Sequence, residues 1–202
     1  MKQKFIPLVL IALLFVSCSD SRGLLDLFSK GPENLSLKKD FTLLEVEGDY
    51  SLLVPKYMKE DKSLHPDASL AYKHEVKEVA VLVIDENKSE LIGSLALLDG
   101  YTDSASFIEN YAKVQMNMIS ANLGFPEMGE PVLKKIGELD AAQVWLEGQI
   151  EEAPVVYFLS CVDAGEKVYM VMSYTSKEKK TKFEDTFRKI ADSFLLISPV
   201  ID

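Results

Sequence analysis

The sequence has few of the residues from which most metal and redox centres are built. Its 202 residues include only two cysteines and two histidines. A zinc site needs three or four ligands at short spacings, and the sequence has neither a CxxC pair nor an HExxH motif. His65 precedes Pro66 in a polar stretch, whereas His74 ends an apolar run. We therefore predict no metal site and no cofactor.

Motifs for nucleotide binding and nucleophilic catalysis are also absent. No GxSxG, GxGxxG or GxxxxGK[ST] pattern occurs. Cys161 lies inside the apolar run VVYFLSCV, which is typical of a small buried core residue. The sequence alone leaves open a pair between this thiol and a histidine. We expect no catalytic residue and no enzymatic activity.

Carboxylates are plentiful, and five of them flank two predicted turns. A calcium site or a general acid–base pair would use such groups. However, 32 acidic residues in one chain bring pairs together by chance, and no EF-hand spacing occurs. We interpret these five as a solvated acidic rim: Glu147, Glu151, Glu152, Asp163 and Glu166.

Positive charge is the scarcer sign. The chain has 22 Lys and Arg residues against 32 Asp and Glu, which gives a formal net charge of −10. Such a surface repels nucleic-acid phosphates and anionic lipid headgroups. We therefore exclude nucleic acid as a partner, and we expect membrane contact to come from an attached lipid.

The N-terminal segment reads as an export signal with a lipid attachment site. Two lysines precede the apolar run Phe5–Val16, which is too short to span a bilayer. The letters FVSC at 15–18 resemble a bacterial lipobox, although Phe15 stands where leucine is usual. We predict a lipoprotein signal peptide at 1–17 and lipid attachment (diacylglycerol and palmitate-type acyl chains) at Cys18. A plain signal peptide or an uncleaved anchor remains an alternative.

Cleavage before Cys18 would remove residues 1–17, whose only charged side chains are Lys2 and Lys4. The formal net charge would therefore move from −10 to −12. Several acyl chains would hold the protein firmly, because each buried methylene contributes about 0.8 kcal/mol. In a Gram-negative organism, Ser19 resembles the outer-membrane sorting pattern. We expect the protein in the bacterial cell envelope, at the periplasmic or surface face of the outer membrane. Residues 18–39 would form a tether, and residues 40–202 a single domain.

The block Ala141–Ile197 has the most regular patterning, with three strands and one amphipathic helix, and we expect the other elements to add to its sheet. Its helix, 179–194, places Phe183, Phe187, Ile190 and Phe194 on one face. A second helix is predicted at 104–123, where Phe107, Tyr111, Val114, Met118 and Ala121 form a stripe. Segments 86–93 and 125–131 are predicted loops. Strands are predicted at 42–46, 50–54, 69–74, 79–85, 132–138, 144–150, 155–162 and 168–174.

The order of these elements resembles the PsbP/Mog1/DcrB-like superfamily. The resemblance rests on the hairpin GDYSLLVPKYM, the stretch ASLAYKHEVKEVAVLVIDE, a long helix, a strand meander and a final helix that ends in IADSF, and it covers about 41–197. It implies an α+β fold, an α/β/α sandwich with a mainly antiparallel central sheet and helices on both faces. It also implies partner binding, and it supplies no catalytic positions.

Three functions follow as hypotheses. The first is an envelope lipoprotein that binds a protein partner or supports an assembly. The second is a carrier or sensor that holds a small hydrophobic ligand between the sheet and helix 104–123, and the weakest is a carboxylate-dependent hydrolase. Trp145, Tyr157 and Tyr169 would form either an aromatic platform or cross-strand packing pairs. Any site is expected in the loops 55–66 or 125–131.

Overall fold

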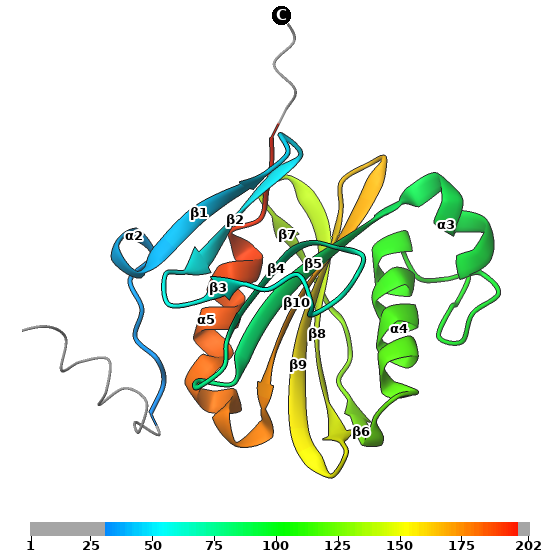
Figure 1. Cartoon of the computed structure of the whole chain (residues 1–202). Coiled ribbons are helices and arrows are strands. Elements are labelled where there is room, and N and C mark those ends of the chain that lie inside the picture. The colour runs from blue at the N-terminus through cyan, green and yellow to red at the C-terminus, as the bar shows by residue number, and fades with distance from the viewer. Residues whose placement is uncertain (1–30, 198–202) are drawn as a thin grey trace, which may run out of the picture.

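The structure, a computed structural model, describes residues 31–197 and contains two β-sheets with helices packed around them (Figure 1). The larger sheet has the order β3-β4-β5-β10-β9-β8-β6, with β7 also paired to β8, and its pairings are antiparallel. Its strands are β3 (Lys59–Glu60), β4 (Ala68–His74), β5 (Val79–Asn87), β6 (Gly124–Met128), β7 (Val132–Ile136), β8 (Leu139–Ile150), β9 (Ala153–Asp163) and β10 (Lys167–Ser176).

The first hairpin does not join this sheet, which corrects the expectation that all elements add to the sheet of the C-terminal block. Strands β1 (Phe41–Val46) and β2 (Tyr50–Pro55) pair with each other and with β11 (Leu195–Leu196) in a separate three-stranded sheet. The chain returns to the hairpin after its last helix, where the Ser193 hydroxyl accepts a hydrogen bond from the amide of Leu53 at 2.9 Å. Long-range pairing of this kind leaves no local mark in the sequence.

Helices cover both faces of the large sheet, as the α/β/α prediction requires (Figure 1). Helix α5 (Lys180–Asp192) and the small sheet lie on one face, and α4 (Phe107–Ser120) lies on the other. The four apolar residues predicted for one face of the final helix are all buried, but only Phe183, Phe187 and Ile190 belong to α5. The helix ends at Asp192, before the predicted end at 194, and Phe194 follows it. The shorter helices are α2 (Leu37–Asp40), α3 (Lys88–Leu95) and the 3-10 turn η1 (Lys177–Lys179).

The predicted charged loop at 86–93 is wrong. Strand β5 continues to Asn87, whose side chain caps α3 by accepting a hydrogen bond from the amide of Ser89 at 3.0 Å. Leu91 and Leu95 then turn toward the core on the α4 side. In a helix this short, the apolar residues are too few to produce a recognisable helical periodicity among the charged residues around them.

The region from 104 to 131 also differs from its prediction. Helix α4 begins after its cap Ser106 and ends at Ser120, so it is three residues shorter at each end than the predicted helix 104–123. Met118 and Ala121 are exposed, although the helical stripe predicted their burial. The predicted loop 125–131 begins with β6, which pairs with β8. Edge strands that are exposed on all residues lack the alternation by which strands are recognised.

Strand β8 is covered on both of its faces. Val144 and Leu146 do point into the core beneath α4. The opposite face is covered as well, because Gln143 is buried and Trp145 packs against Phe187 of α5. Two apolar residues of this block are exposed: Ile150 at the end of β8 and Leu195 in β11.

The last part of the predicted tether is docked on the domain. The main-chain amide of Glu33 donates a hydrogen bond to the carbonyl of Lys182 at 2.8 Å, and Lys189 Nζ donates one to the carbonyl of Leu35 at 2.8 Å. Glu33 is only 2% exposed. The boundary placed at residue 40 is therefore too late, and the folded part of the chain includes residues 33–39.

Candidate functional site

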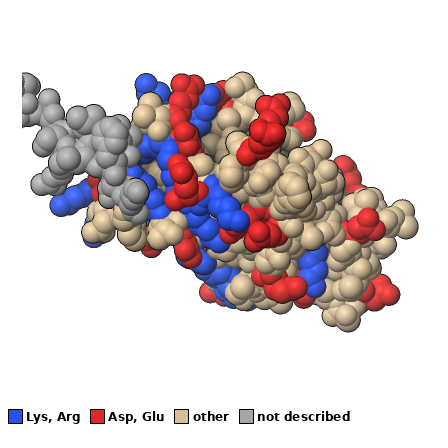
Figure 2. Space-filling model, turned by 90° about the horizontal axis from the view of Figure 1, so that it is seen from below, with Lys and Arg blue, Asp and Glu red and all other residues tan. Residues whose placement is uncertain are grey.

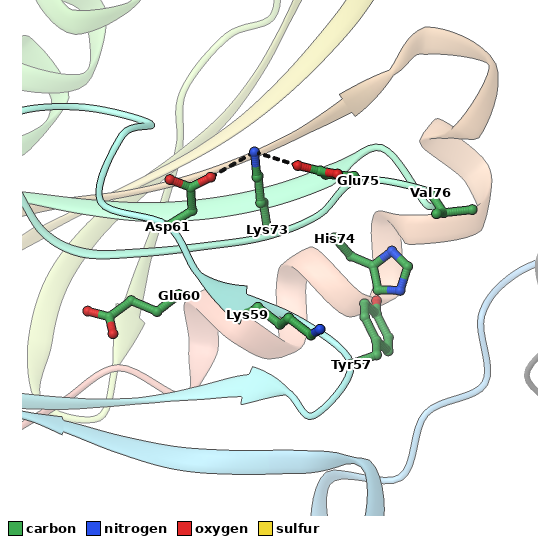
Figure 3. A pocket seen from close by; sticks show the side chains of 8 residues that line it. All are labelled: Tyr57, Lys59, Glu60, Asp61, Lys73, His74, Glu75 and Val76. Carbon is green, nitrogen blue, oxygen red and sulfur yellow. Dashed lines mark ion pairs between the residues drawn. The ribbon is translucent and has the colours of Figure 1, made fainter.

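A pocket of about 480 Å³ opens beside β3 and the end of β4 (Figure 3). Four of its lining residues come from the loop 55–66, one of the two places where the sequence led us to expect a site. The lining consists of Tyr57, Lys59, Glu60, Asp61, Lys73, His74, Glu75 and Val76. We call it the His74 pocket.

One wall of the His74 pocket is an ion triad. Lys73 Nζ lies 2.7 Å from Asp61 and 3.0 Å from Glu75 (Figure 3). The hydrogen bond from Lys73, together with those from Ser63, lowers the pKa of Asp61 to about 2. The bond to Asp61, followed by that to Glu75, raises the pKa of Lys73. These charges satisfy one another, so none of them is poised to exchange protons near neutral pH.

His74 is held in one tautomer. Its Nδ1 accepts a hydrogen bond from the main-chain amide of Lys77 at 3.1 Å, and its ring meets Tyr57 edge to face at 5.5 Å. Burial, followed by the positive charge of Lys77 and more weakly that of Lys59, lowers the pKa of His74. The imidazole is therefore neutral at pH 7, and because Nδ1 accepts, the proton resides on Nε2.

A buried ion pair lies behind the pocket wall. The Glu33 carboxylate accepts hydrogen bonds from Lys77 Nζ at 2.7 Å, from the Tyr57 hydroxyl at 2.8 Å and from the Thr186 hydroxyl at 2.9 Å. Lys77 Nζ also lies 4.3 Å from the centre of the Tyr57 ring. Buried charges are costly unless they are fully paired, and here the pairing fixes the residues that in turn orient His74. The burial of Glu33 could not be predicted from the sequence, because the residues around it in the chain are polar and typical of turns.

A second feature is a group of exposed apolar side chains at the β6–β7 end of the large sheet. Phe125 is 84% exposed, and its backbone φ of 49° lies in the left-handed region that bulky residues avoid. Figure 2 shows few basic side chains over the half of the molecule that carries α4 and β6, whereas Lys and Arg form a band over the α5 half. The group, called the apolar edge below, comprises Met118, Phe125, Met128, Val132, Leu133 and Ile150.

A smaller pocket of about 270 Å³ adjoins the apolar edge on the α5 face. Gly129 and Glu130, from the second predicted site loop, line it together with Trp145 and Arg188. The amide of Gly129 donates to the carbonyl of Trp145 at 2.9 Å, and a Cβ at position 129 would lie 3.2 Å from that carbonyl oxygen, which is a tight contact. Both predicted site loops therefore contribute to pockets.

A third cluster joins the two sheets. Lys167 Nζ lies 2.7 Å from Asp49 and 3.0 Å from Asp85, and the Tyr169 hydroxyl donates to Asp49 at 2.8 Å. The hydrogen bond to Asp49, followed by that to Asp85, raises the pKa of Lys167. A lysine that is kept charged is a poor nucleophile, so this cluster serves to hold the small sheet against the large one.

The remaining residues singled out in the sequence do not converge on a site. Cys161 is completely buried on the α4 side, whereas His74 is on the other side, beside Tyr57, so they form no catalytic pair. His65 is in a loop, and its Nδ1 accepts the amide of Asp67 at 3.2 Å.

The five rim carboxylates separate into two groups at opposite ends of β9. Glu147 is paired with Lys177 and Lys180, and Asp163 with Lys88. The other three are exposed: Glu151, Glu152 and Glu166. Within residues 31–197, no group of three or more His, Cys, Asp and Glu side chains could hold a metal ion.

The three aromatic residues make cross-strand and core contacts rather than one platform. Trp145 packs on Phe158 with ring centroids 4.6 Å apart, and Tyr157 packs on Tyr174 at 5.5 Å. Tyr169 packs against Tyr50 beneath the small sheet. Trp145 and Tyr157 lie on opposite faces of the large sheet, which rules out a shared binding surface.

The predicted lipid attachment at Cys18 and the signal peptide 1–17 lie outside the described residues. Within residues 31–197, no helix is both long and apolar enough to cross a membrane.

Comparison with known proteins identifies the fold. No protein-family model matches the sequence, and no curated protein matches it. Among solved structures, cyanobacterial PsbP (CyanoP) from Synechocystis sp. PCC 6803 matches with a TM-score of 0.54 at 12% identity, over 78% of this chain and 92% of that one. The predicted PsbP-like α+β fold is thus confirmed.

Two other structures match with lower TM-scores. PA94 from Pseudomonas aeruginosa, a protein of unknown function described as a putative regulator, has a TM-score of 0.44 at 13% identity, over 79% of this chain and 99% of that one. LpqN from Mycobacterium tuberculosis, described as involved in cell envelope biogenesis, has a TM-score of 0.44 at 11% identity, over 82% of this chain and 83% of that one.

Proposed function

We propose that this protein is a lipid-anchored protein of the bacterial cell envelope whose domain binds a partner protein and performs no chemistry of its own. The observation that carries the binding proposal is the apolar edge. It contains six of the thirteen large apolar side chains that are exposed between residues 31 and 197. Exposed apolar groups gathered in one region are typical of interaction surfaces, whereas scattered ones are ordinary.

The position of the apolar edge adds to this proposal. Strands β6 and β7 both pair with β8 on one side, and neither pairs with another described strand on its outer side. Proteins usually protect such edges with charge or with short, twisted strands, because an exposed edge can accept a further strand. A partner segment could pair with this edge and cover its apolar side chains at the same time.

The backbone of Phe125 supports the same interpretation. Holding a bulky residue at positive φ costs about 1–3 kcal/mol, and the exposed ring gains little from packing in the free domain. Burial of that ring in a partner would offset the cost. A position that combines strain with exposure is therefore a good candidate for a contact residue.

Photo-crosslinking in the native membrane tests the binding proposal. A photo-reactive residue at Phe125 or Met118 should crosslink to one envelope protein. Leu43 on β1 is the matched control, because it is 54% exposed against 55% for Met118 and belongs to the other sheet. Equal products from all three positions, or none from Phe125 and Met118, would refute the proposed surface.

The lipid anchor has its own test. In cells, Cys18→Ala should abolish labelling with radioactive palmitate and release the protein from membranes. Release by mild carbonate washing of the unaltered protein would contradict the anchor. Fractionation of the membranes then decides whether the outer membrane is its site.

The packing beneath α4 argues against the carrier hypothesis. The predicted ligand space between α4 and the sheet is occupied by side chains from both sides, among them Ile108 and Tyr111 of α4 and Val144 and Leu159 of the sheet. The Tyr111 hydroxyl donates to Glu86, which ties the helix to β5. Native mass spectrometry of the purified protein should therefore show the unliganded mass. A mass increase that corresponds to a bound lipid would support the carrier hypothesis instead.

A further inference from the structure

We propose that the His74 pocket binds a small carboxylate, through the Lys59 ammonium and the Nε2–H of His74. This ligand site lies at the β3–β4 end of the large sheet, away from the β6–β7 end that carries the apolar edge. The proposal therefore does not rest on the proposed function.

The charges that line the pocket leave one cation available. Lys73 is held between Asp61 and Glu75, and Glu60 lies 3.5 Å from Lys62. Lys59 has no ion pair with any described residue. In Figure 3 its side chain extends toward Tyr57, in the opposite direction to the Glu60 carboxylate. An incoming anion would therefore meet Lys59 without first displacing an acidic neighbour.

His74 supplies a second donor beside that cation. Its Nδ1 accepts the amide of Lys77, so the proton of the neutral ring is on Nε2. The groups around the ring are Tyr57, the cations of Lys77 and Lys59, and the Glu33 carboxylate, which is itself engaged with Lys77. Two donors, one charged and one neutral, match the two oxygens of a carboxylate.

The remaining walls define the rest of the ligand. The Tyr57 ring and the exposed side chain of Val76 offer apolar surface next to the donors. A volume of about 480 Å³ in an open pocket suits a short-chain acid or the end of a peptide chain. The shared chemistry is a carboxylate on a small apolar group.

The buried pair behind the wall makes the site rigid. Glu33 fixes the Tyr57 hydroxyl at 2.8 Å and Lys77 Nζ at 2.7 Å, and the amide of Lys77 fixes His74. The ligand would therefore not have to order these rings itself, which reduces the entropic cost of binding.

Histidine NMR on the full mature protein in detergent micelles tests this site. With ¹³C-labelled histidine, the chain has two signals, from His74 and from the internal control His65. Propionate should shift the His74 signal in a saturable way and raise the pKa of His74 by about 1, because a nearby negative charge favours the imidazolium. The His65 signal should not respond.

Two substitutions separate binding from general salt effects. Lys59→Gln should weaken propionate binding roughly tenfold, since a charge-assisted hydrogen bond is lost. Lys135→Gln, an exposed lysine on β7, is the matched control and should leave binding unchanged. An unchanged affinity in Lys59→Gln, or an equal His74 response to sodium chloride, would overturn the proposal.

A short peptide that ends in valine distinguishes the two sources of the carboxylate. If the peptide acid binds at least as well as propionate and its C-terminal amide does not bind, the site recognises a chain terminus. If propionate alone binds, it recognises a free acid. Equal binding of the peptide acid and its amide, or no response to either acid, would refute carboxylate recognition.

Discussion

The Glu33 carboxylate lies 2.7 Å from the Lys77 ammonium, and both side chains are almost completely shielded from solvent, at 1% and 9% exposed. The two residues are 44 positions apart in the sequence. Their contact, together with the hydrogen bond from Thr186 of α5, connects the N-terminal segment, the β4–β5 turn and the last helix. The segment that precedes the first strand is therefore part of the folded domain.

Glu33→Gln should lower the free energy of unfolding by about 3 kcal/mol, because it replaces the negative charge that neutralises the buried Lys77 ammonium with a neutral amide. The measurement is urea denaturation at pH 7. Glu45→Gln, an exposed residue of β1, is the control and should change stability by less than about 0.5 kcal/mol. A similarly small effect of Glu33→Gln would mean that the segment does not contribute to the fold.

Glu147 should make stability depend on pH in the acid range. Hydrogen bonds from Lys177 and then Lys180 lower the pKa of Glu147 from its ordinary value of 4.5. A carboxyl group with a lower pKa in the folded state contributes stability that is fully present above 4.5 and is lost as pH falls through the folded-state value. Glu147→Gln should therefore flatten the decline of the unfolding free energy below pH 4.5.

The matched control for Glu147 is Glu138→Gln, because Glu138 is exposed and has no ion pair with residues 31–197. Its stability profile should follow that of the unaltered protein. If the unfolding free energy of both variants declines below pH 4.5 as steeply as that of the unaltered protein, the ion pairs of Glu147 with η1 and α5 contribute nothing measurable in solution.

Cys161 should be unreactive in the folded protein. Burial is complete, and it raises the pKa of the thiol above its ordinary value, so almost no thiolate is present near pH 8. Iodoacetamide should label less than about one tenth of Cys161 in native protein within a time that suffices for complete labelling in urea. Mass spectrometry of tryptic peptides gives the site, and rapid native labelling at 161 would show that the core beneath α4 opens.

Phe125→Asn should separate binding from folding. The side chain is exposed, and asparagine tolerates positive φ better than phenylalanine does, so the unfolding free energy should stay constant or rise by up to about 1 kcal/mol. Crosslinking from position 118 should be lost at the same time. A loss of stability of more than about 1 kcal/mol would show that the ring packs within the domain.

The strands of the core and the final helix could be predicted because their signals are local. Phe183, Phe187 and Ile190 repeat at helical spacing, and the apolar runs that became β5, β9 and β10 lie between turn residues. Burial of Cys161 followed from its place in such a run. The general fold was predictable for the same reason, since layers follow from which elements have apolar faces.

The candidate sites could be located only roughly. The loops 55–66 and 125–131 line pockets, as expected, but the partners of their residues come from distant segments. Nothing near Glu33 in the sequence points to Lys77 or Thr186, and nothing near Phe125 shows that β6 ends a sheet. Burial of a charge and exposure of a ring are properties of the assembled chain.

The sequence by itself determined the spacing of apolar residues in the helices and strands, the excess of acidic residues and the N-terminal export pattern, because each depends only on composition or on residues that are close together in the chain. The tertiary structure alone decided that the first hairpin forms its own sheet with β11, that Glu33 is buried against Lys77, and that four apolar side chains of β6 and β7 are exposed. The first two of these features depend on contacts between segments more than forty residues apart, and such contacts form only when the whole chain packs.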